Sequence, residues 1–146
     1  MNQIIAEVEG DAVYRQMIEA SHTPAQPNTA DAICCAMRRV AGLIHLAATV
    51  SYTSSGYSSL RAARERPEAP ILSMTPNIAT ARRLALVWGV HSVHTHEVAD
   101  VQEMVDYACQ TALREEFAKP GENIVIIAGM PFGASGTTNL LRIAHC

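Results

Sequence analysis

Short apolar segments alternate with segments of helical periodicity over most of the chain. The apolar segments, residues 47–52, 70–74, 90–93 and 123–128, are rich in β-branched residues and have the length of buried strands. A helix between two such strands brings the chain back to the edge where the first strand began, so consecutive strands run parallel. The alternation therefore predicts an α/β fold, a three-layer sandwich with helices on both faces of a mainly parallel sheet.

The last strand-like segment departs from this rule. Residues 139–144 follow the strand at 123–128 after a loop rich in Gly, Ser and Thr, with no helical segment between them. A strand that returns without a crossover pairs antiparallel. We therefore expect about five strands, the last of them antiparallel to its neighbour. One helical pattern begins at Thr29, before the first strand. Three further helical patterns, at residues 58–66, 77–88 and 97–117, lie between the strands.

The first 27 residues differ from the rest of the chain. Residues 1–20 carry a helical apolar pattern that is interrupted at Gly10, and residues 21–28 contain two prolines, which is typical of a connector. With 146 residues, the chain has the length of one domain, about 100–150 residues. We therefore divide it into a lead-in helix and linker at 1–27 and one compact domain at 28–146.

Charged residues make up 17% of the chain, below the roughly 25% of ordinary soluble domains. Two stretches, 40–60 and 123–141, carry no charge at all. Each runs from an apolar segment into a polar loop, and neither has the roughly 20 continuous apolar residues that span a bilayer. We therefore expect no membrane partner and attribute the missing charge to buried elements and to ligand-binding loops.

The sign of the charge changes along the sequence. The net charge is −3, which argues against nucleic acid as a partner. Residues 38–83, however, hold seven arginines against two acidic residues, and acidic segments flank them on both sides. A basic middle of this kind suits a small anion better than a long polyanion.

Two loops at predicted strand ends carry the residues most suited to binding such an anion. Residues 53–59, with the sequence TSSGYSS, connect a strand to a helix. A helix N-terminus presents unpaired N–H groups and a partial positive charge, and ligands of open α/β sheets bind beyond the carboxyl ends of the strands. Residues 129–139 leave a second strand end with three glycines and several hydroxyl groups. The pattern at 53–59 fits a phosphate site and an ordinary capped turn about equally well. The alternative for 129–139 is a mobile connection without a ligand.

The remaining polar clusters favour structural roles. His94 and His96 project to one side of a strand, but the sequence does not place carboxylate or thiolate partners beside them at the spacing of metal ligands, so we expect no metal site. Cys34 and Cys35 are expected to be small core residues, and four thiols without a CxxC pair predict a cytoplasmic protein. No nucleophile, base and orienting group occur together. The residues thus favour an anion-binding regulatory or assembly domain over a small enzyme or metal protein.

Several stretches resemble one protein family. The order NTADAICCAMRRVA, TSSGYSSLRAARERPEAPILSMTPN, ARRLALVWGV and NIVIIAGMPFGASGTTNLLRI is similar to that in the C-terminal α/β domain of bacterial pyruvate kinases. The similarity runs from about Ile4 to Ile143. Its most specific parts are the RPEAPIL…TPN…AR stretch and the closing GASGTTN.

The resemblance implies that the chain is part of a larger subunit. In this family a catalytic barrel, which binds magnesium and potassium, transfers phosphate from phosphoenolpyruvate to ADP, and residues 1–20 resemble the last helix of that barrel. The rest of the barrel is not in this sequence. We therefore expect no catalytic residue, no cofactor in this domain and no activity of the chain alone. The expected partners are the barrel and the other subunits of a homotetramer.

The family's C-terminal domain binds phosphorylated sugar effectors. The resemblance assigns this binding to nine residues: Thr53, Ser54, Ser55, Gly56, Ser58, Gly133, Ser135, Gly136 and Thr137. Family members often carry Lys or Arg where this chain has Ser54 and Tyr57, so a charge-assisted contact is missing. Bisphosphate binders also use a Trp and an Arg near residues 97–117, which offer only Arg114.

The departures favour a monophosphate effector, or none, over fructose 1,6-bisphosphate. Two alternatives to effector binding stay open on the sequence. One is a purely structural assembly domain without a ligand, and the other is a stand-alone phosphate-binding α/β module.

Overall fold

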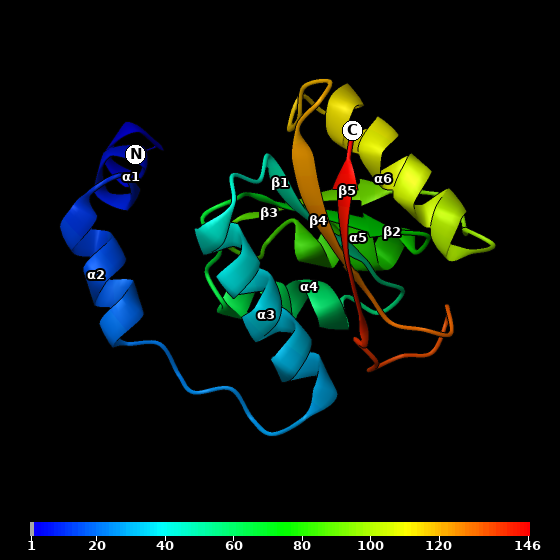
Figure 1. The fold of residues 1–146 in the computed structure, drawn as a ribbon, viewed down its shortest axis with the longest axis horizontal. Coiled ribbons are helices and arrows are strands. Elements are labelled where there is room, and N and C mark those ends of the chain that lie inside the picture. Colours follow the sequence, from blue (N-terminus) through cyan, green and yellow to red (C-terminus); the bar gives the residue numbers. More distant parts are fainter. Residues whose placement is uncertain (1) are drawn as a thin grey trace.

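A computed structural model, which describes residues 2–146, contains a five-stranded sheet (Figure 1). The strands are β1 (Ala48–Tyr52), β2 (Ile71–Thr75), β3 (Val90–His94), β4 (Asn123–Ala128) and β5 (Leu140–His145). They lie in the order β3-β2-β1-β4-β5. The first four strands run parallel, and β5 is antiparallel to β4. The predicted mixed sheet with an antiparallel last strand is confirmed.

The helices are α1 (Asn2–Glu9), α2 (Ala12–Ala20), α3 (Thr29–Leu43), α4 (Tyr57–Arg64), α5 (Ile78–Leu84) and α6 (Val101–Arg114). The apolar residues of α3 and α4 belong to one core, and those of α6 belong to a second core on the opposite face of the sheet (Figure 1). The expected three layers are therefore present. Within residues 2–146, none of the helices combines the length and the apolar character needed to cross a membrane.

Two helices are shorter than their sequence patterns predict. α5 ends at Leu84, because the residues that follow turn toward Gly89, whose φ is 68°. α6 begins at Val101 because the carboxylate of Asp100 accepts a hydrogen bond from the backbone N–H of Glu103 at 2.8 Å and so caps the helix there. At α6 the apolar pattern continues past the helix because Val98 and Phe117 also pack against the core, whereas Ala85 and Trp88 beyond α5 are exposed.

The side chains of β1 alternate between the two faces of the sheet. Val50 and Tyr52 pack in the core beneath α6. On the other face, the Oγ atoms of Ser51, Ser59 and Ser73 form a buried chain with 2.7 Å between neighbours. Because buried hydroxyl groups need partners, this chain fixes the position of α4 over β1 and β2. It thereby positions the first turn of α4 at the carboxyl end of the sheet.

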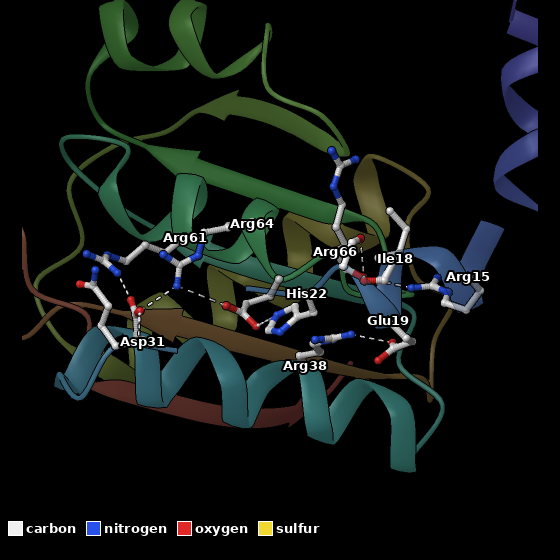
Figure 2. A network of polar contacts seen from close by, with 12 residues as sticks. Arg15, Ile18, Glu19, His22, Asp31, Arg38, Arg61, Arg64 and Arg66 are labelled. Atoms are coloured by element: carbon white, nitrogen blue, oxygen red, sulfur yellow. Dashed lines mark hydrogen bonds and ion pairs between the residues drawn. The ribbon is translucent and has the colours of Figure 1, made fainter. Parts of the chain in front are cut away.

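Polar contacts hold the N-terminal segment against the domain (Figure 2). The fully buried carboxylate of Glu65 lies 2.8 Å from Nε2 of His22, which belongs to the linker after α2. Arg15 of α2 donates from Nη1 to the carbonyl of Arg66 at 3.1 Å. These contacts fix α2 near the end of α4, although α2 has no buried residue of its own within the part of the chain that the structure describes.

Asp31 is a second fully buried carboxylate. It lies in the first turn of α3 and pairs with the guanidinium groups of Arg61 and Arg64, the latter at 2.7 Å (Figure 2). Its Oδ2 also accepts a hydrogen bond from the backbone N–H of Gln26 at 2.8 Å. A buried carboxylate is destabilising unless it is paired and hydrogen-bonded. Asp31 therefore joins the linker, α3 and α4 at one point.

Candidate functional site

The loop between β1 and α4 turns sharply beyond the carboxyl end of a central strand. Oγ1 of Thr53 accepts a hydrogen bond from the backbone N–H of Gly56 at 3.0 Å. Gly56 has a φ of 89°, a conformation that favours glycine, and an added Cβ would lie 3.3 Å from the side chain of Leu84. The glycine thus allows residues 53–56, which we call the first loop, to turn directly into α4.

The N-terminus of α4 differs from those of α2, α3, α5 and α6. The side chains of Asp11, Asn28, Asn77 and Asp100 accept hydrogen bonds from the first turns of α2, α3, α5 and α6. Gly56 occupies the same position at α4, and among the described residues no side-chain cap is formed there. The first-turn N–H groups of α4, together with the partial positive charge of a helix start, are therefore available to an anion.

Residues 129–139, which we call the second loop, leave the carboxyl end of β4 beside the first loop. The Oγ of Ser58 and the Oγ1 of Thr138, 80 positions apart in sequence, are 2.6 Å apart and link the two segments. At the base of the second loop, the side-chain amide of Asn139 donates to the carbonyl of Met130 and accepts from its N–H, both at 2.8 Å. The loop is therefore closed at its base and held over the start of α4.

A small cleft lies between the two loops, and it brings together most of the residues that the sequence singles out. Seven of the nine line it: Thr53, Ser54, Ser55, Ser58, Gly133, Gly136 and Thr137. The other two do not, because Gly56 is buried against α5 and Ser135 is exposed in the second loop. The cleft is completed by Tyr52, Tyr57, Gly129, Phe132 and Ala134.

Sequence patterns do not indicate two further contributors to this site. Phe132 packs edge to face against Tyr52, with ring centroids 5.3 Å apart. Arg83 of α5 donates from Nη2 to the carbonyl of Ser55 at 3.2 Å and so brings a positive charge to the first loop. As one of two adjacent arginines on a short helix, Arg83 has the sequence signature of a solvated face. Only the packing of α5 beside the first loop reveals its position.

The electrostatic environment of the cleft suits an anion. None of its twelve lining residues, all within the described part of the chain, is acidic. Burial raises the pKa of Tyr52, whose hydroxyl oxygen accepts a hydrogen bond from the N–H of Val98 at 3.2 Å. Tyr52 is therefore neutral at physiological pH, and the guanidinium of Arg83, which donates to the carbonyl of Ser55, brings a positive charge to the first loop.

The histidines and the adjacent cysteines lie outside the cleft. His94 contacts a backbone carbonyl at 3.2 Å, and His96 packs on Tyr107 with ring centroids 4.4 Å apart. In residues 2–146 no three His, Cys, Asp or Glu side chains are grouped so as to hold a metal ion. Cys34 is fully buried, but Cys35 is exposed, so the expectation that both are core residues is wrong for Cys35. Adjacent residues of a helix point in different directions, and only one of the two can face the sheet.

Gly129→Ala is expected to lower the free energy of unfolding by roughly 2 kcal/mol and to displace the second loop. A Cβ at this position would overlap the backbone carbonyl of Thr137, which cannot move without shifting the loop. Urea unfolding followed by circular dichroism measures the loss. Gly42→Ala is the control, because an added Cβ there meets no atom within 4 Å. Equal urea midpoints for the two variants would show that the loop is not closely packed at its base.

The sheet topology and the cleft define an α/β domain with a candidate site for a small anion at the carboxyl edge of its parallel strands. Comparison with known proteins identifies the family. Residues 31–144 match the family described as the alpha/beta domain of pyruvate kinase. The chain belongs to this family, as the sequence motifs predict.

Individual relatives are similar over nearly the whole chain. It is 41% identical over 144 residues to a pyruvate kinase of Methylorubrum extorquens, covering 99% of this chain and 30% of that protein. It is 37% identical over 145 residues to a pyruvate kinase of Agrobacterium vitis, with 99% and 30% covered. It is also 37% identical over 143 residues to a pyruvate kinase of Geobacillus stearothermophilus, with 98% and 24% covered. The chain therefore spans less than a third of the length of these relatives.

Proposed function

We propose that the chain is the regulatory and oligomerisation domain of a pyruvate kinase and that its cleft binds a phosphorylated sugar. The whole enzyme would transfer phosphate from phosphoenolpyruvate to ADP in a catalytic domain that also holds the magnesium and potassium ions. The observation that carries the proposal is the N-terminus of α4, which lacks a side-chain cap and faces the second loop across a cleft lined by hydroxyl groups.

The phosphate group would lie against the first turn of α4. Backbone N–H groups there and the hydroxyl groups of Ser54 and Ser55 are the available donors, and Ser58 can join them when it accepts its hydrogen bond from Thr138. Oriented donors at a helix start stabilise a phosphate dianion. Gly133 and Gly136 of the second loop have positive φ values and open space around Cα, so their backbone can approach a ligand closely. The second loop would then cover the sugar.

The distribution of positive charge favours a monophosphate. Arg83 stands beside the first loop, whereas Arg114 lies at the far end of α6, where its Nε is 3.2 Å from the carboxylate of Glu115. Arg83 is therefore the arginine that donates to the first loop, beside the one helix start at the cleft, which matches one phosphate group. Arg61, whose guanidinium lies 4.5 Å from the ring centroid of Tyr57, is paired with Asp31 instead. A second phosphate would have no comparable group to pair with among the residues that line the cleft.

Exposed apolar side chains support the proposed contacts with the rest of the enzyme. Ile4 and Val8 of α1 and Val13 and Met17 of α2 are each at least half exposed. Amphipathic helices bury such faces against another surface, which we assign to the catalytic barrel. β5 is an edge strand, and within residues 2–146 no strand pairs with its outer side. We assign this edge to contacts between subunits, since free strand edges recruit further chains.

Titration calorimetry of the chain with ribose 5-phosphate, glucose 6-phosphate, AMP and fructose 1,6-bisphosphate tests the proposal. We expect at least one of the monophosphates to bind, and to bind more tightly than the bisphosphate, because the site has one positive centre. Ribose and glucose without phosphate serve as controls and should give no binding heat. Silence from all four phosphates, both here and in a full-length pyruvate kinase that carries this domain, would favour a purely structural assembly role.

A further inference from the structure

Two cysteines that are far apart in sequence meet near the end of β5. Cys109 lies in α6 and Cys146 follows β5, and the C-terminal end of the chain lies beside α6 (Figure 1). Their Sγ atoms are 2.7 Å apart. Because a disulfide bond is about 2.05 Å long, the two sulfurs stand about 0.7 Å from bonding distance. We propose that Cys109 and Cys146 form a reversible disulfide bond that joins α6 to the end of β5.

The backbones that carry these two sulfurs are held in place. The N–H of Cys146 donates to the carbonyl of Glu122 at 3.0 Å, and the N–H of Gly121 donates to the carbonyl of Cys146 at 2.6 Å. Cys109 follows Ala108, which is fully buried in the core under α6. The short distance between the sulfurs therefore arises from two anchored segments.

The other two cysteines are poorly placed for the same reaction. Cys34 is fully buried, and burial, followed by the nearby Glu65 carboxylate, raises its pKa to about 12. Cys35 is exposed and adjacent to Cys34 on a helix, so the two side chains diverge. Cys109 and Cys146 are only partly buried, so a small oxidant can reach them. The pairing should therefore be selective.

The contact between the sulfurs also sets the order of the reaction. The thiol of Cys146 donates its hydrogen to Sγ of Cys109. Burial, together with this hydrogen bond, raises the pKa of Cys146 to about 12, so Cys146 is the poorer nucleophile of the pair for the first step. The natural class of oxidant is a low-molecular-weight disulfide such as oxidised glutathione.

The exchange proceeds in two balanced steps. The Cys109 thiolate attacks one sulfur of the small disulfide, forms a mixed disulfide and releases one small thiolate, which takes up a proton. Cys146 then loses its proton to water or buffer, and its thiolate attacks Sγ of Cys109 and expels the second small thiolate. The protein loses two hydrogen atoms, and the small disulfide is reduced to two thiols. Excess reduced thiol reverses both steps.

The bond would stabilise the domain at the end of the sheet opposite the cleft. In the β4–β5 pair, Asn123 faces His145 near the cysteines, whereas Ala128 faces Leu140 near the second loop. The cross-link closes a chain segment that contains both strands, and such a constraint lowers the entropy of the unfolded state. We expect the oxidised chain to unfold at a temperature several degrees higher than the reduced chain, with the contacts of the cleft unchanged.

Intact mass measurement after incubation with oxidised glutathione tests the inference directly. We expect a loss of two hydrogen masses, and peptide mapping after alkylation should show Cys109 linked to Cys146. The increase in melting temperature should disappear on addition of dithiothreitol. Both effects should be absent in Cys146→Ser and in Cys109→Ala, and both should persist in Cys35→Ser, which removes the exposed thiol.

Other outcomes would overturn the inference. Retention of a glutathione on Cys109 without an internal cross-link would show that Cys146 cannot reach Cys109. A chain that keeps four alkylatable thiols in excess oxidised glutathione would show that the pair stays reduced. Because none of these measurements uses a phosphorylated ligand, their result is independent of the function proposed for the cleft.

Discussion

Asp31→Ala is expected to lower the free energy of unfolding by roughly 3 kcal/mol, the low end of what removal of one partner from a buried ion pair costs. The carboxylate is fully buried and pairs with Arg61 and Arg64. Its removal takes from Arg61 the carboxylate that it pairs with, whereas Arg64 keeps the Glu65 carboxylate at 3.6 Å. Both arginines are partly exposed to water, with 21% and 40% of their side-chain surface accessible, which keeps the loss at the low end.

Urea unfolding of the variant, followed by circular dichroism, measures this loss. Glu19→Ala is the matched control, because Glu19 is exposed and its 2.6 Å contact with Arg38 is worth about 1 kcal/mol or less. Asp31→Asn should fall between the two, since it keeps an acceptor for the N–H of Gln26 but loses the charge. If Asp31→Ala is no less stable than Glu19→Ala, the buried pairs contribute nothing net to folding.

Ser55→Asp is expected to weaken binding of a phosphorylated ligand by about 100-fold, or about 2.7 kcal/mol, because it places a carboxylate where a dianion would bind. Ser55 is partly exposed at the cleft, so an aspartate can be accommodated without unfolding the first loop. Titration calorimetry of the variant with the monophosphate that binds the unmodified chain measures the effect.

Ser55→Asn separates charge from size in this experiment. It has nearly the same shape as the aspartate but no charge, and it should cost no more than about tenfold in affinity. Equal losses for both variants would mean that the cleft responds to side-chain volume alone. Unchanged binding in Ser55→Asp would place the ligand elsewhere, and unchanged kinetics of a full-length enzyme with this substitution would support a purely structural domain.

The strands were predictable because their signals are local. The segment 123–128 is apolar and β-branched over its whole length, and the structure places β4 on it residue for residue. Helix ends were less predictable, as at α6, because one capping carboxylate, Asp100, decides the first turn while the apolar pattern extends beyond it. The fold class therefore followed from pattern, whereas the boundaries depended on single hydrogen bonds.

The candidate site shows the same division. Glycine and hydroxyl residues after two strands indicated both loops, and the topology of a parallel sheet places such loops at one edge. The hydrogen bond between Ser58 and Thr138 and the approach of Arg83 to Ser55 had no signature in the sequence. Each joins residues that are 80 or 28 positions apart, and each depends on how helices settle on the sheet.

The sequence by itself determined the class of fold, the antiparallel last strand, the family and the two loops that carry the candidate site. Short-range patterns suffice for these, because burial periodicity and turn chemistry act over a few residues. The tertiary structure decided which side chains meet: the carboxylate of Asp31 with two arginines, Arg83 with the first loop, and Cys109 with Cys146. Such contacts form only when the whole sheet and its helices pack together, and no local preference of the chain encodes them.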